Sequence, residues 1–273
     1  MKPSKKGHVR HPMMYEICAL TDQGLVRKNN EDIVAFDRQT GLCLLADGMG
    51  GYKAGEVASA MAVASLTQEL NAWLLRTGLQ APVRDIRRRM KTGVQSANLA
   101  IFEAACSNPD QEGMGTTLVA GVFMPGRLVL GHVGDSRCYR LRGRVLVQLT
   151  KDHSMLQGQV DAGLITPAQA WVSPHRNLIT RALGVESSVR VDIDDHPVEP
   201  GDLYLMCSDG LSDMVESQAI AAILNASGAL PKKAQSLVQA ANDGGGRDNI
   251  SVLLAQAVAI GAGRSLMSRM LGK

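Results

Sequence analysis

The chain has 273 residues, of which 45% are hydrophobic and 20% are charged, and its formal net charge is +3. This composition excludes an intrinsically disordered chain, and the small charge argues against nucleic acid as the main partner. Because no stretch approaches the roughly 18 uninterrupted apolar residues of a membrane-spanning helix, we expect no membrane span.

The start of the chain is basic but lacks the apolar region of a signal peptide, so we expect residues 1–13 to form a disordered basic tail. Cysteines stand alone, without a CxxC pair, at positions 18, 43, 106, 138 and 207. Isolated cysteines in apolar runs are typical of small buried side chains in a reducing compartment. We therefore expect a cytoplasmic protein without disulfides.

The first third of the chain predicts strands followed by two helices. Short apolar or β-branched runs predict strands at 15–20, 33–37 and 42–46. Apolar residues then recur three and four positions apart, first from Val63 to Trp73 and again from Ile86 to Ile101. This spacing predicts two amphipathic helices, the second opened by Pro82.

The rest of the chain predicts more strands than helices. Strands are expected at 116–124, 127–133, 137–141, 144–149, 189–193, 202–208 and 250–258, and helices at about 214–225 and 231–241. Hairpin-linked strands with helices inserted in pairs predict an α+β fold, in which pairs of helices pack outside antiparallel β-sheets. Since no repeat or linker interrupts residues 14–260, we expect a single domain, followed by a tail at 261–273.

Two of the apolar runs end in an aspartate followed by a glycine. The stretch LLADGMGG contains Asp47, and LYLMCSDG ends in Asp209 and Gly210. Two such strands side by side would bring two carboxylates together, which is unfavourable unless a cation lies between them. Oxygen ligands select hard ions, so the pattern indicates Mg²⁺ or Mn²⁺.

Three further acids occupy similar junctions between turn residues and strands. Asp32 stands in RKNNED, Asp135 in GHVGDSR and Asp248 in GGGRDN. Each of these alone is typical of an ordinary turn. As a set, each next to Gly or Asn and an apolar strand, they indicate a metal centre.

In order, RKNNED, LLADGMGG, GMGTTL, GHVGDSRCYRL, KDHS, NLITRALG, CSDGLSD and GRDNISV resemble the motifs of the metal-dependent protein phosphatase family, type 2C. The resemblance runs from about residue 15 to 258, and the short form with DGMGG is similar to the bacterial branch. It implies a fold of two antiparallel β-sheets sandwiched between pairs of helices, which agrees with the predicted elements. It also implies hydrolysis of phosphoserine and phosphothreonine in proteins, by water activated between two ions of Mn²⁺ or Mg²⁺.

Carried over position by position, the resemblance implies a role for each acid. Asp47 would bridge the two ions and the Gly48 carbonyl would ligate one of them. Asp209 and Asp248 would hold the other ion, and Asp32, with Glu31 beside it, would act near the second through water. Arg27 would bind the substrate phosphate, so that catalysis rests on Arg27, Asp47 and Asp209. Asp135 and Asp213 match a third, weaker metal position, and a flap is expected at about 154–177.

Some assignments stay open. Many relatives have His where this chain has Met49, and a thioether cannot protonate a leaving alkoxide, so the general acid is not identified. Asp213 could instead be an N-cap or first-turn acid of the following helix. His132 and His153 are expected to be structural. The basic run RDIRRRMK at 84–91 predicts a solvated helix face, with docking to an acidic partner as the alternative.

The expected substrates are proteins phosphorylated by a bacterial-type Ser/Thr kinase, and the expected state is a monomer. Two alternative functions stay open. One is a non-catalytic relative that only binds phosphoproteins, and another is a phosphatase dedicated to one regulatory switch, such as a sigma-factor antagonist. A calcium-binding β module is disfavoured because the DxDxDG spacing is missing.

Overall fold

The structure is a computed structural model that describes residues 13–50, 54–173 and 178–259. Met13, the last residue of the predicted N-terminal tail, is instead the first residue of a strand. The rest of that tail and the predicted tail at 261–273 lie outside the described residues, as does the end of the predicted flap, 174–177.

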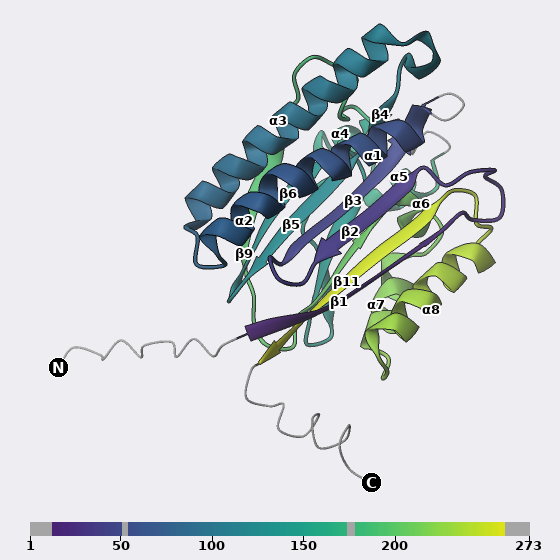
Figure 1. Ribbon diagram of the computed structural model, residues 1–273. Helices are drawn as coiled ribbons and strands as arrows, with labels where there is room; N and C mark the ends of the chain where they lie inside the picture. Colours follow the sequence, from purple (N-terminus) through teal and green to yellow (C-terminus); the bar gives the residue numbers. More distant parts are fainter. Residues whose placement is uncertain (1–12, 51–53, 174–177, 260–273) are drawn as a thin grey trace.

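Two antiparallel sheets lie face to face (Figure 1). The first, called here the β11 sheet, has the order β1 (Met13–Asp22), β11 (Ile250–Ala259), β10 (Leu203–Cys207), β7 (Arg137–Arg142) and β8 (Val145–Gln148). The second, the β3 sheet, has the order β2 (Asp32–Asp37), β3 (Leu42–Met49), β5 (Leu118–Met124), β6 (Arg127–Val133) and β9 (Asp192–Pro197), and β4 (Gly115–Thr116) pairs with the end of β3.

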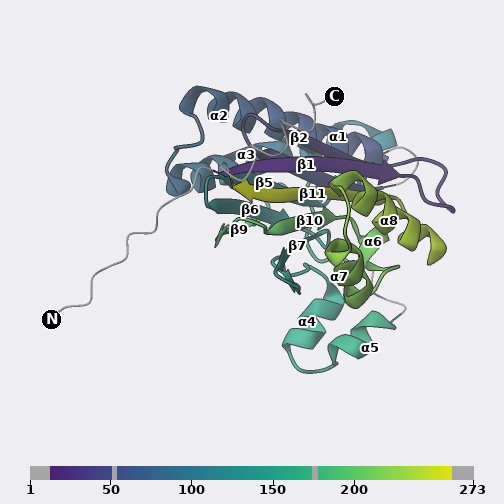
Figure 2. The ribbon, with the colours of Figure 1, turned by 90° about the horizontal axis from the view of Figure 1, so that it is seen from below.

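Helices cover the outer face of each sheet. The β3 sheet is covered by α1 (Ala54–Leu66), which continues through the π-helical turn η1 (Thr67–Asn71) into α2 (Ala72–Thr77), and by α3 (Val83–Ser107), which leads to η2 (Pro109–Gln111). The β11 sheet is covered by α7 (Ser217–Asn225) and α8 (Leu230–Asp243), after the short turn α6 (Asp209–Ser212). Figure 2 shows α4 (Met155–Asp161) and α5 (Pro167–Trp171) standing away from the two sheets.

The burial of β3 on both faces explains why its apolar residues do not alternate with polar ones. Leu42, Leu44 and Ala46 pack against the helices, while Cys43 and Leu45 point into the layer between the two sheets. A strand that is covered on both faces buries every side chain, so its sequence is a continuous apolar run. Strand β10 alternates in the same way between the helical layer and the inner layer. The predicted fold class is confirmed.

Two predicted elements were misplaced. The strand expected at 189–193 is β9, Asp192–Pro197; it pairs with β6, while Val189 and Val191 pack against the helical core instead. The helix expected from 214 begins at Ser217, because Val215 is buried in the core between α6 and α7. Both errors arise because apolar residues mark burial, whether or not they belong to a regular element.

The predicted burial of the cysteines is confirmed for three of the five. All five cysteines are free, and Cys43, Cys138 and Cys207 are buried as predicted, but Cys106 is exposed.

The basic run lies on α3, where Arg87 donates a hydrogen bond to Asp195 of β9. No helix within the ranges 13–50, 54–173 and 178–259 is long and apolar enough to cross a bilayer.

Candidate active site

The candidate site lies where the apolar layer between the sheets ends. Asp47 is on the same face of β3 as Cys43 and Leu45, and the register of β2 and β3 puts Asp32 directly opposite it. Across the sandwich, Ser208 follows β10 and donates its hydroxyl to Asp32 Oδ2 at 2.7 Å. The two sheets therefore meet here through polar side chains in place of apolar ones.

The backbone of Asp47 is held by two threonines. Its N–H donates to Thr117 Oγ1 at 3.1 Å, and its carbonyl accepts from Thr116 Oγ1 and from the Thr117 N–H, each at 2.9 Å. Neither threonine was a predicted site residue. The motif GMGTTL marked the segment, but only the pairing of β3 with β4 and β5 reveals what its hydroxyls do.

The glycine after each aspartate is required by a second backbone that packs against it. A Cβ on Gly48 would lie 2.1 Å from the carbonyl oxygen of Gly55, at the start of α1. A Cβ on Gly210 would lie 2.0 Å from the carbonyl oxygen of Asn249. Both distances are far below contact distance, so no side chain fits at either position. The Asp-Gly pairs thus reflect close packing of chain segments.

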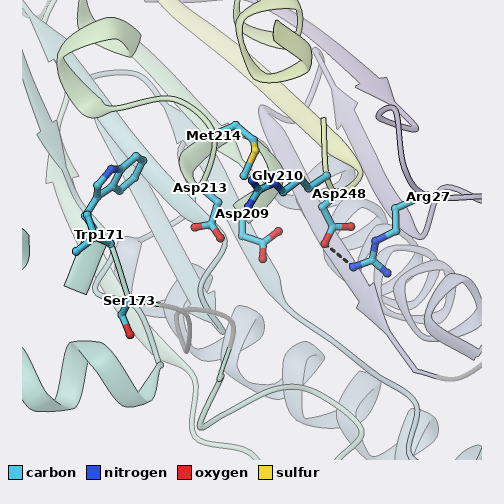
Figure 3. A pocket seen from close by; sticks show the side chains of 10 residues that line it. Arg27, Trp171, Ser173, Asp209, Gly210, Asp213, Met214 and Asp248 are labelled. Atoms are coloured by element: carbon cyan, nitrogen blue, oxygen red, sulfur yellow. Dashed lines mark hydrogen bonds and ion pairs between the residues drawn. The ribbon is translucent and has the colours of Figure 1, made fainter. Parts of the chain in front are cut away.

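Three more of the predicted acids line one cavity of about 760 Å³ (Figure 3). Asp209 begins α6, and Asp213 is the C-cap residue of that turn, whose N–H donates to the Asp209 carbonyl at 2.7 Å. Asp248 lies beside them, and its Oδ1 accepts from the N–H of Asn249 at 2.8 Å. Asp213 precedes α7 by several residues, so its interpretation as an N-cap or first-turn acid of that helix is wrong.

Arg27 enters the same cavity from the loop between β1 and β2. Its guanidinium donates to Asp248 Oδ2 at 2.5 Å, and about half of the Arg27 side chain remains exposed. In Figure 3 the guanidinium points toward the row of carboxylates formed by Asp248, Asp209 and Asp213. A charged group whose other N–H donors bind none of the described residues therefore faces the cavity.

The carboxylates oppose one another's ionisation. Burial raises the pKa of Asp32 to about 7, and the hydrogen bond from Ser208 offsets only part of this. Burial, and next the charge of Asp32, raise the pKa of Asp47 well above its usual value. Burial, and next the charge of Asp135, do the same for Asp209. Asp135 itself has a pKa raised to about 7 by burial and by the neighbouring Asp152.

The donor set suits a hard divalent cation. It consists of carboxylate oxygens on two facing sheets, and Asp32 Oδ1 is buried without a hydrogen-bond partner. In the described part of the chain, no group of three or more His, Cys, Asp or Glu side chains is arranged so that it could hold a metal ion. The acids are thus gathered at one end of the sandwich but not closed around one point, as mutual repulsion predicts.

Known proteins share both this sequence and this fold. A model of the protein phosphatase 2C family matches residues 26–249. The chain belongs to the protein phosphatase 2C family. It is 40% identical over 239 residues to the serine/threonine phosphatase stp of Listeria monocytogenes, covering 86% of this chain and 93% of that protein. It is 41% identical to the serine/threonine protein phosphatase PstP of Mycobacterium tuberculosis, covering 91% of this chain and 46% of that protein.

Solved structures of 2C-family phosphatases have the same architecture. The catalytic domain of PstP in complex with two manganese ions matches with a TM-score of 0.79 and 40% identity, covering 90% of this chain and 99% of that one. Stp1 from Staphylococcus aureus matches with a TM-score of 0.82 and 32% identity, covering 93% and 99%. The predicted family and its sandwich fold are confirmed.

Residues of the motifs GHVGDSR and KDHS form hydrogen bonds that hold the turn that carries Asp135 in place. Arg137 binds the carboxylate of Asp152, with its shortest contact at 2.6 Å. His153 Nδ1 accepts from the Gly134 N–H at 3.0 Å, and the His153 ring lies 4.6 Å from that of His132, centroid to centroid. Both histidines thus contact the scaffold, in keeping with the structural role expected for them.

Asn249, the last residue of the family motif GRDN, organises the loop that carries Arg27. Its Oδ1 accepts from the Glu31 N–H at 2.8 Å, and its Nδ2 donates to the carbonyls of Gln23 and Asn29 at 3.0 and 2.9 Å. From the sequence, Asp248 was the only residue of this motif with a predicted role. The bonds join segments more than 200 residues apart, which no local pattern shows.

The opposite wall of the cavity comes from the predicted flap. Trp171 ends α5, and Val172 and Ser173 follow it. Figure 3 shows Trp171 and Ser173 across the cavity from the acids. Gly210, Met214 and Arg247 complete the lining. None of these residues was a predicted site residue, although the flap itself was expected in this part of the chain.

Proposed function

We propose that the chain is a metal-dependent protein phosphatase that hydrolyses phosphoserine and phosphothreonine in other proteins. The observation that carries this proposal is the set of acids gathered at one end of the sandwich. Asp32 and Asp47 face each other on the β3 sheet, and Asp209 and Asp248 line the cavity with Arg27. Membership in the 2C family and 40% identity to a serine/threonine phosphatase support it.

The metal ligands are part of this proposal. Asp47 and the Gly48 carbonyl, with Asp209 and Asp248, would hold two ions of Mn²⁺ or Mg²⁺, and Asp32 would act beside them. Asp135 and Asp213 would hold a third, weaker ion. When bound, the ions would supply the positive charge that a phosphomonoester dianion needs before water can attack its phosphorus. The PstP catalytic domain in complex with two manganese ions supports this choice of metal.

Arg27 would bind the substrate phosphate. A guanidinium can contact two phosphate oxygens at once, and Asp248 already orients this one at 2.5 Å. Catalysis would then rest on Arg27, Asp47 and Asp209. Met49 has no proton to donate, so protonation of the leaving alkoxide would fall to a group other than this side chain.

The cellular setting is also proposed. Phosphoproteins made by a bacterial-type Ser/Thr kinase would be the substrates, in cytoplasmic signal transduction, and the enzyme would act as a monomer. Residues 14–260 would form a single phosphatase domain, with 154–177 as its flap. No observation favours a non-catalytic relative or a phosphatase dedicated to a single regulatory switch.

Turnover by the purified chain tests the function. We expect hydrolysis of p-nitrophenyl phosphate and of a phosphothreonine peptide with Mn²⁺, and no hydrolysis with excess EDTA. Asp47→Asn should lose most of the activity while keeping its circular dichroism spectrum. Asp110→Asn, the same change at an exposed carboxylate in η2, should keep wild-type activity. Hydrolysis that survives complete chelation would reject the metal-dependent mechanism.

A further inference from the structure

Arg247 is a second arginine at the rim of the same cavity. Its side chain is exposed and lines the cavity together with Arg27, Asp209 and Asp248. Arg27 is bound to Asp248, whereas Arg247 forms no ion pair with any residue in the part of the chain that the structure describes. A guanidinium at the rim of an acid-lined cavity that pairs with none of the described carboxylates has donors available for a ligand.

The backbone that carries Arg247 is held in place. The Gly246 carbonyl accepts from the Leu25 N–H at 2.7 Å, and the Gly246 N–H donates to the Ala241 carbonyl at 3.0 Å. Gly246 has φ +50°, and a Cβ there would lie 2.5 Å from Asn242 Oδ1. The loop therefore has little freedom to move, and Arg247 extends from a fixed point beside the proposed phosphate site.

Apolar side chains are exposed in the cavity wall at Val172 and in the loop just before Arg27. Val172, which lines the wall opposite Asp248, is 77% exposed. Leu25 and Val26, which precede Arg27, are 68% and 64% exposed. Leu25 also contacts the loop of Arg247, since its Cγ lies 2.8 Å from the position of a Cβ on Gly246. Clustered exposed apolar residues commonly mark a binding surface.

We propose that Arg247 forms an anion subsite next to the phosphate site. It would bind an acidic or phosphorylated side chain that flanks the target phosphoresidue in an extended protein substrate. The proposal rests on the proposed function. Extended residues advance by roughly 3.3–3.6 Å, so a neighbour one or two positions away can reach a second group on the same rim. Guanidinium binds carboxylate and phosphate alike through paired hydrogen bonds.

The chemistry of the rim favours this ligand over a purely apolar one. Leu25, Val26 and Val172 can pack against the aliphatic parts of a peptide, but an anion forms stronger hydrogen bonds with the Arg247 donors than a neutral group does. A charge-assisted hydrogen bond at a partly exposed site corresponds to a preference of about tenfold in kcat/KM. Because the contact lies at the surface, the preference should shrink as ionic strength rises.

Three phosphothreonine peptides test the subsite in the full chain. The first has neutral neighbours, the second has glutamate two positions on either side, and the third has a second phosphothreonine there. We expect kcat/KM about tenfold higher for the second or the third peptide than for the first. Arg247→Gln should reduce this ratio to about one, and Arg247→Lys should keep part of it. Arg84→Gln, at an arginine on α3 that is 87% exposed, should leave the ratio as in wild type.

The comparison of ratios separates this proposal from the function on which it rests. A ratio near one for wild type with both charged peptides overturns the subsite, as does a ratio that Arg247→Gln leaves intact. Hydrolysis of p-nitrophenyl phosphate in the same preparation shows that the catalytic function stands in either case. If that substrate is not hydrolysed either, the proposed function fails and the subsite fails with it. A gain with only one charged peptide supports the subsite and identifies which anion it prefers.

Discussion

Asp32→Asn should make the metal-free protein more stable at pH 8. The pKa of Asp32 is raised from 3.8 to about 7, chiefly by burial, so between these values the native state keeps a proton that the unfolded state has lost. The free energy of unfolding therefore falls as pH rises through this interval. Above pH 7 the full cost is about 4 kcal/mol, at about 1.4 kcal/mol for each pH unit between the two pKa values.

Asparagine removes that cost and still offers an oxygen to the Ser208 hydroxyl. In EDTA at pH 8, we expect urea unfolding to give a free energy higher than wild type by up to about 4 kcal/mol. The gain should shrink toward zero below pH 3.8, where Asp32 is protonated in both states. With Mn²⁺ added, the variant should gain less stability than wild type, because it has lost one of the charges that favour the cation.

Asp202→Asn is the matched control. Asp202 is also buried, at 1% exposure, but Arg142 binds both of its carboxylate oxygens at 2.8 Å. Here the same substitution removes a paired charge, so it should lower the free energy of unfolding by about 2 kcal/mol. If Asp32→Asn is also destabilising at pH 8 in EDTA, the ionised Asp32 carboxylate does not carry the burial cost argued above.

Three further predictions concern single residues. Arg27→Ala should lower kcat/KM for a phosphopeptide by about 10- to 100-fold, from the loss of a charge-assisted contact, and wild-type kinetics would remove its assigned role. Asp135→Ala should keep tight metal binding in calorimetric titration but reduce turnover at saturating metal; if both match wild type, Asp135 is a turn residue. Burial, with the charge of His153 next, lowers the pKa of His132 from 6.5 to about 3, so its contribution to stability is complete above pH 6.5 and is lost as pH falls. His132→Gln should therefore flatten the urea-measured loss of stability between pH 6.5 and 4, whereas parallel curves would contradict a buried neutral imidazole.

Several features of the site were accessible from the sequence. The apolar runs of β3 and β10 each end at an aspartate, which predicted acids at the ends of buried strands. The conflict among these charges predicted a cation, since carboxylates gathered without one oppose each other's ionisation. The order of the motifs indicated the family. These inferences depend on residues that are neighbours in the chain.

Other contacts of the site could not be predicted in this way. Thr117 holds the backbone of Asp47 across 70 positions, and Ser208 reaches Asp32 across 176. Asn249, more than 200 residues along the chain, donates hydrogen bonds to the backbone of the loop that carries Arg27. Each bond depends on the register of a strand pair or on how the two sheets face each other, and no local periodicity encodes either.

The sequence by itself determined the types of element, the apolar layers and the acids at the strand ends, because burial on one or two faces dictates side-chain polarity along each strand. Tertiary structure alone decided which acids meet. It set Asp32 opposite Asp47, made Asp213 the C-cap of α6, and bound Arg27 to Asp248 while leaving Arg247 without an ion pair among the described residues. The physical reason is that the partners of a side chain depend on strand register and sheet packing, which long-range contacts fix together.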